Sequence, residues 1–149
     1  MATSNTVGAS TDRANFVVTL ILRIAGAALL VGMAYIHYHL YVAGYHLTAV
    51  GPAFIANAVL GIIAAIAVLV MPSKLLSITS ALSSLLMLGT FAALMISIYA
   101  GLFGYKETTT APLLKTTYVV EIAGTIVLAV LAILVARRHG MWKWMPGHS

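Results

Sequence analysis

Long apolar stretches alternate with short polar segments along this chain. Four such stretches cover 16–42, 52–71, 75–103 and 113–136. A hydrocarbon core about 30 Å thick takes ~20 apolar residues in a helix that rises about 1.5 Å per residue, and each stretch reaches that length. The apolar runs show no period of two, and in lipid such runs satisfy their backbone hydrogen bonds as helices rather than as barrel strands. The pattern therefore predicts an all-α membrane protein with four transmembrane helices.

The polar segments between the stretches are short, and this spacing predicts the organisation of the chain. Helices joined by short connections are usually antiparallel neighbours, so we expect an up-down-up-down bundle. Three regions are predicted: a disordered cytoplasmic tail over 1–14, a four-helix transmembrane domain over 15–138 and a cytoplasmic interfacial tail over 139–149. In the last region Trp142 and Trp144 flank a lysine, which is typical of an interfacial anchor.

Composition narrows the class of protein further. The chain is 62% hydrophobic and only 7% charged, whereas soluble domains have about a quarter charged residues, so a soluble fold is excluded. The absence of cysteine removes disulfide frameworks and thiolate metal sites. The net charge of +5 comes from the ends of the stretches and not from a basic patch interleaved with aromatics, so we expect no nucleic-acid partner. The expected partners are the lipid bilayer and other membrane-protein subunits or further copies of this chain.

Basic side chains gather at one end of the predicted bundle and indicate its orientation. That end holds Arg13, Arg23, Lys74, Arg137, Arg138 and Lys143. The opposite end has Lys106 and Lys115, partly offset by Glu107. By the positive-inside rule both termini are cytoplasmic, in a multi-pass protein of the inner (plasma) membrane. Arg23 lies within the first apolar stretch, close enough to its start to snorkel to the interface.

The first stretch ends in a segment rich in histidine and tyrosine, AYIHYHLYVAGYH. His37 and His39 are two positions apart, about 200° around a helix axis, so they face opposite directions. His37 continues a stripe of small and apolar residues that includes Gly26 and Ala34, so we expect it to face the bundle interior. His39 is then expected to face lipid or a partner.

An ionisable residue, Glu121, lies about nine residues inside the fourth stretch, ~12 Å along the helix. Its burial at that depth costs ~2.5 kcal/mol or more, which makes it a candidate functional residue. His37, Asn57 and Met95 lie at a comparable depth on the other three stretches.

Three interpretations of this level of the bundle stay open. The first is a polar network of His37, Asn57, Tyr118 and Glu121 that fixes helix register. The second is a site for a proton, a quinone headgroup or a metal, with His37, His39, Met95 and Glu121 as candidate metal ligands. The third is simple exposure at the interface.

The start of the second stretch carries a further motif, Gly51, Phe54 and Asn57 in the spacing Gly-x-x-Phe-x-x-Asn, and the loop GLFGYKE follows later. With the His/Tyr-rich end of the first helix, this pattern resembles small four-span bacterial membrane proteins, a group without an established activity. The resemblance covers nearly the whole chain. It implies the four-span topology and no mechanism.

No nucleophile elbow, phosphate loop or carboxylate pair is present in the sequence, so an enzyme acting on its own is not expected. We expect a small accessory subunit that packs against larger membrane proteins without its own catalytic site. One alternative is a redox-linked subunit with an outer-leaflet copper, haem or quinone shared with a partner. Haem is disfavoured within one chain because the histidines near that leaflet lie on the first helix or the loop after it. A second alternative is a small transporter or proton pathway formed by an oligomer.

Overall fold

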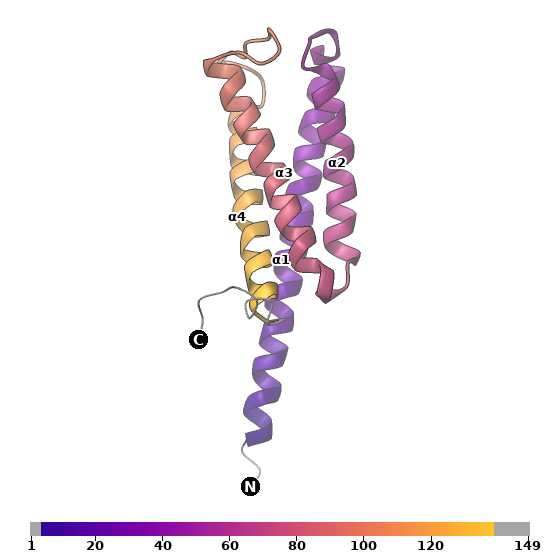
Figure 1. The fold of residues 1–149 in the computed structure, drawn as a ribbon, viewed down its shortest axis with the longest axis vertical. Coiled ribbons are helices and arrows are strands. Elements are labelled where there is room, and N and C mark those ends of the chain that lie inside the picture. The colour runs from indigo at the N-terminus through magenta and orange to yellow at the C-terminus, as the bar shows by residue number, and fades with distance from the viewer. Residues whose placement is uncertain (1–3, 139–149) are drawn as a thin grey trace, which may run out of the picture.

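The computed structural model describes residues 4–138, with side chains from Asp12 onward. The elements are α1 (Ser4–Val42), a short 3-10 helix η1 (Tyr45–Leu47), α2 (Gly51–Val70), α3 (Ser73–Tyr99) and α4 (Leu114–Arg138) (Figure 1). The predicted interfacial tail over 139–149 lies outside the described residues.

The four long helices confirm the all-α class and the number of apolar spans. Each is long and apolar enough to cross a membrane, with the span of α1 counted over Asp12–Val42. The start of α1 differs from the prediction, because the helix begins at Ser4 and includes most of the segment expected as a disordered tail. This segment has no proline to stop a helix that the apolar stretch has started. The first part of α1 extends beyond the other three helices (Figure 1).

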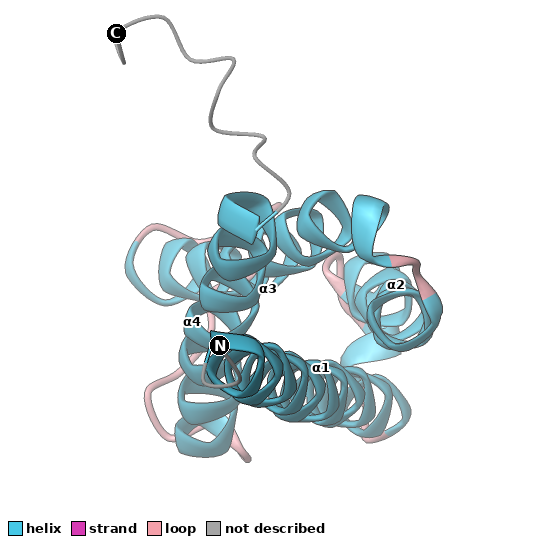
Figure 2. Cartoon of the chain, turned by 90° about the horizontal axis from the view of Figure 1, so that it is seen from below, coloured by secondary structure: helices cyan, strands magenta, loops and turns pink. Residues whose placement is uncertain are grey.

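The helices form a ring when seen along their length, with α1 beside α2 and α4 (Figure 2). Packing is most extensive between α1 and α2 and between α3 and α4, while α2 and α3 touch only slightly. Glycines permit the close approaches: Gly61 lies against Met33 and Ala34 of α1, and Gly124 lies against Met87 of α3. Small residues therefore set the helix contacts, as expected where lipid provides no hydrophobic drive between helices.

Apolar side chains fill the middle of the bundle and also cover its outside. Leu30, Met87 and Leu128 are among the residues with no exposed surface. Large apolar side chains such as Ile63 and Ile126 are more than half exposed on the outer faces. This arrangement, apolar inside and outside, is that of a multi-pass membrane protein.

Two arginines join helices at the end of the bundle that holds the turn between α2 and α3, which we call the turn end. The Arg23 guanidinium donates to the carbonyls of Leu69, at 3.1 Å, and Met71, at 2.6 Å. It therefore caps the last turn of α2, where a positive charge also complements the helix dipole, instead of only reaching to the interface. Arg138 donates to the carbonyl of Asn15, at 2.8 Å, and to the hydroxyl of Thr19.

Hydroxyl side chains of α3 provide further bonds. Ser77 donates to the carbonyl of Ala132 at 2.9 Å, and Ser84 donates to the carbonyl of Thr125 at 2.8 Å. Because Ser77 and Ser84 are two helical turns apart, they lie on one face of α3 and tie it to α4.

Candidate binding site

A cavity of about 80 Å³ lies between the helices near the end formed by η1 and the loop after α3, which we call the loop end. All four long helices contribute to its wall, together with η1 and the loop. A single water needs only about 10–15 Å³ on this scale, so the cavity has room for a molecule of several heavy atoms. Its polar lining residues are His37, Tyr45, Asn57, Thr90, Ser97, Tyr105, Glu107, Thr117 and Glu121.

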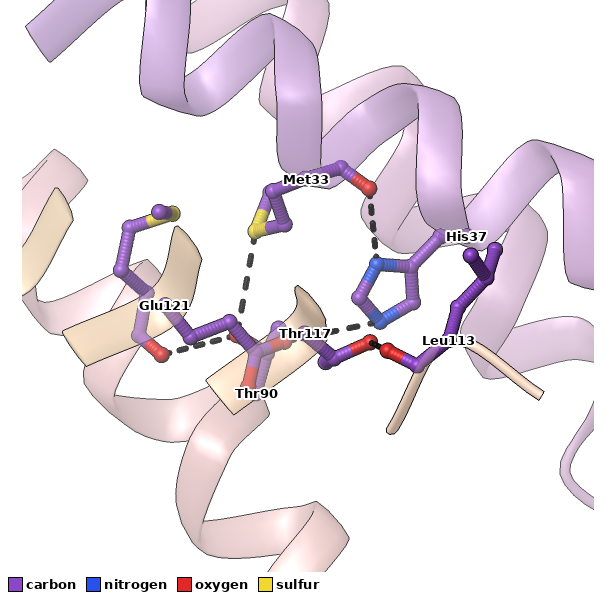
Figure 3. Close-up of polar contacts among 7 residues, drawn as sticks. Met33, His37, Thr90, Leu113, Thr117 and Glu121 are labelled. Atoms are coloured by element: carbon purple, nitrogen blue, oxygen red, sulfur yellow. Dashed lines mark hydrogen bonds and ion pairs between the residues drawn. The ribbon is translucent and has the colours of Figure 1, made fainter. Parts of the chain in front are cut away.

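His37 and Glu121 face each other across this cavity from α1 and α4 (Figure 3). Their nearest atoms, Nε2 and Oε1, are 3.9 Å apart. The other ring nitrogen of His37, Nδ1, is 2.9 Å from the carbonyl of Met33. A carbonyl only accepts, so Nδ1 carries the hydrogen, and Nε2 of neutral His37 is an acceptor that faces an acceptor carboxylate. A proton or a cation between the two groups turns this contact between two acceptors into a favourable one.

The Glu121 side chain is 1% exposed, and neither of its oxygens has a hydrogen-bond partner among the described residues. Two hydroxyls that line the same cavity have other acceptors. Thr90 donates to the carbonyl of Met87 at 2.8 Å, and Thr117 donates to the carbonyl of Leu113 at 3.0 Å (Figure 3). A buried carboxylate without donors is costly, so this position calls for a donor from outside the chain or a proton.

A second carboxylate, Glu107, lies in the loop after α3 and is fully engaged. Its Oε2 accepts from the Tyr45 hydroxyl at 2.7 Å, and its Oε1 accepts from the backbone N–H of Thr108 at 2.9 Å and from the Tyr105 hydroxyl at 3.4 Å. Burial raises the pKa of the Tyr45 phenol, and the hydrogen bond to Glu107 raises it further. Tyr45 therefore stays protonated and ties η1 to the loop.

Aromatic rings form one wall of the cavity. The ring of Phe54 is centred 5.2 Å from that of His37 and 4.7 Å from that of Tyr45, and Tyr45 is 5.8 Å from Tyr105. Phe54 and Asn57 are three residues apart on α2 and both line the cavity. A Cβ on Gly51 would lie 2.8 Å from the carbonyl oxygen of Tyr45, so this glycine lets η1 pack on α2. The whole Gly-x-x-Phe-x-x-Asn motif is thus used at the site.

The structure brings together only part of the polar network predicted from the sequence. His37, Asn57 and Glu121 line the cavity. Tyr118 does not line it and packs edge-on against Phe91, with ring centres 5.8 Å apart. Tyr118 is three residues before Glu121, and its ring turns toward α3 instead.

The four candidate metal ligands also do not gather. His39 is exposed on the other side of α1 and stacks on Tyr35 at 5.9 Å, as its spacing from His37 requires. Met95 is half-buried on α3 and does not line the cavity. Between residues 12 and 138, no three His, Cys, Asp or Glu side chains are grouped to hold a metal. A metal at His37 and Glu121 stays a prediction.

Glu107, Tyr45 and Tyr105 were not predicted as site residues. The signal available was the loop GLFGYKE, which puts a tyrosine two positions before a carboxylate. Positive φ values at Gly101 and Gly104 turn this loop back over the bundle, and the N–H of Glu107 donates to the carbonyl of Ser97 at 3.1 Å. The return of the loop depends on these backbone contacts, which the sequence pattern does not specify.

No family model, curated protein or solved structure matches this chain. Its function is therefore inferred from the chemistry of the site.

Proposed function

We propose that this protein is a small accessory subunit of a larger membrane assembly, and that it contributes a ligand-binding cavity rather than a catalytic centre. The observation that carries the binding role is the Glu121 carboxylate, buried without a hydrogen-bond donor among the described residues and 3.9 Å from His37. Ionisable groups inside membrane helices are expensive, and those that persist there usually serve function. The surrounding apolar and aromatic wall with a few convergent polar groups is typical of a small-molecule site.

Binding fits the geometry better than nucleophilic catalysis. His37 contacts the Met33 carbonyl and faces Glu121, and the hydroxyls of Thr90 and Thr117 donate to backbone carbonyls. Neither hydroxyl is paired with a base that would activate it. His37 and Glu121 are therefore better placed to accept hydrogen bonds from a ligand than to attack a substrate.

The proposed arrangement in the membrane is an up-down-up-down bundle in the inner (plasma) membrane with both termini cytoplasmic. The contact of Arg23 with the end of α2 and of Arg138 with Asn15 supports antiparallel neighbours. The turn end also holds Lys74 and Arg137, whereas the loop end has two lysines and Glu107. The positive-inside rule then places the loop end outside the cell.

Single cysteines test this topology, because the chain has none of its own. We expect His46→Cys and Thr109→Cys, at the loop end, to react with a membrane-impermeant thiol reagent in intact cells. Ser73→Cys, exposed at the turn end, is expected to react only after the membrane is opened. The reverse pattern would show that the proposed orientation is wrong.

Purification in a mild detergent tests the accessory role. We expect larger membrane proteins to co-purify with the tagged chain and to remain bound to it through washing. A harsher detergent is expected to lower the amount of these proteins. Crosslinking in intact cells before solubilisation should capture the same proteins. If the chain elutes alone in mild detergent, both with and without crosslinking, the accessory role is contradicted.

A further inference from the structure

We infer that the loop-end cavity binds a small organic amine in its ammonium form, with the ammonium group at Glu121 and the hydrocarbon part against the aromatic wall. The inference rests on the proposed function in taking the cavity as a binding site, and goes further by naming the class of ligand.

The charge of the cavity favours a cation. The chain has only three acidic residues against eight Lys and Arg, yet two of the three, Glu107 and Glu121, line this cavity. No Lys or Arg of the described part of the chain lines it. A cleft whose charged groups all have one sign and whose walls have a low dielectric constant concentrates ligands of the opposite charge.

The hydrogen-bonding groups favour an ammonium ion with N–H donors. Both Glu121 oxygens lack a donor among residues 12–138, whose side chains the structure describes, and Nε2 of neutral His37 is a further acceptor 3.9 Å away. A primary ammonium group brings three donors and no acceptor, so it satisfies this set with charge-assisted bonds. A quaternary ammonium ion has no N–H and leaves the Glu121 oxygens unpaired.

The wall favours a ligand that also has a hydrocarbon part. The rings of Tyr45, Phe54 and Tyr105 line the cavity, and Leu40 and Leu94 add aliphatic surface, so the wall can bury apolar carbon atoms. The Glu107 oxygens are already bonded to Tyr45, Tyr105 and Thr108, so Glu107 adds negative charge and holds the loop in place. The cavity therefore matches a short alkylamine in both polar and apolar parts.

The test uses the full chain in detergent and compares n-butylammonium chloride with 1-butanol and tetramethylammonium chloride at constant ionic strength. We expect butylammonium to raise the unfolding temperature and to give a binding isotherm in calorimetry. The alcohol lacks the charge and tetramethylammonium lacks the N–H donors, so both are expected to bind at least about tenfold more weakly. Equal binding of the alcohol would overturn the amine assignment while the binding role in the proposed function stands. Equal or tighter binding of tetramethylammonium would overturn the role of the N–H donors.

Variants locate the site. Glu121→Gln keeps the shape and removes the charge, so it should weaken butylammonium binding by about 10- to 100-fold. The matched control is Asp12→Asn, which changes the remaining acidic residue, exposed and outside the cavity, and should leave binding unchanged. Phe54→Leu keeps both carboxylates and should weaken binding severalfold, which tests the site even if the Glu121 variant fails to fold. Unchanged affinity in Glu121→Gln would overturn the inference, and no response of the wild-type chain to any probe would overturn both the inference and the binding role.

Discussion

Replacing Gly61 by leucine is expected to separate α1 from α2 and to destabilise the bundle more than any other single change considered for this protein. A Cβ at Gly61 would lie 2.8 Å from the Met33 methyl group, 3.0 Å from the Ala34 Cβ and 3.1 Å from the Leu30 carbonyl oxygen. The methionine end can move, but the alanine Cβ and the carbonyl move only with the helix. Overpacking of this kind costs about 1–3 kcal/mol and sometimes more, and here it acts on the most extensive contact in the fold.

Gly89→Leu is the matched control, because Gly89 is also a helical glycine but would place its Cβ in open space. We expect this variant to unfold at or slightly above the wild-type temperature, since leucine favours a helix over glycine by up to about 1 kcal/mol. Thermal unfolding in one detergent, followed by circular dichroism, measures both variants. Similar losses in the two would show that the contact at Gly61 is not what holds α1 to α2.

The second large effect is expected at the pair of His37 and Glu121. With a proton held between Glu121 and His37, each group satisfies the other, so changing either residue alone to leucine leaves a buried polar group without a partner, at a cost of about 1–3 kcal/mol. The double variant leaves neither group, so its loss should be smaller than the sum of the single losses by roughly 0.5–3 kcal/mol. Unfolding free energies of the three variants, measured in one detergent, give this coupling.

His39 supplies the control for this comparison of single and double variants. It is also a histidine of α1, but it is exposed and faces away from Glu121. His39→Leu combined with Glu121→Leu should be additive within about 0.3–0.5 kcal/mol. If the pair with His37 is equally additive, the two groups do not interact across the 3.9 Å that separates them.

Much of the fold follows from the sequence, since an apolar stretch long enough to cross a bilayer has few alternatives to a helix. The predicted stretch over 52–71 corresponds to α2 at Gly51–Val70, and Pro72 stands at the turn before α3. The helix α1 begins at Ser4, before the apolar stretch that predicted it, because hydrophobicity reports where a helix enters lipid and not where it begins.

The sequence by itself determined the number of long helices, the inward face of His37 and the position of Glu121 along the fourth helix, because helical periodicity and rise convert residue numbers into direction and distance. Only the tertiary structure decided that Tyr118 and Met95 do not line the cavity and that Arg23 caps α2. It also brought Glu107 over the cavity, where Tyr45 bonds it. These features depend on the rotation of each helix against its neighbours and on the path of the loop between α3 and α4. Both are set by contacts between residues far apart in the chain, which the pattern of one stretch does not contain.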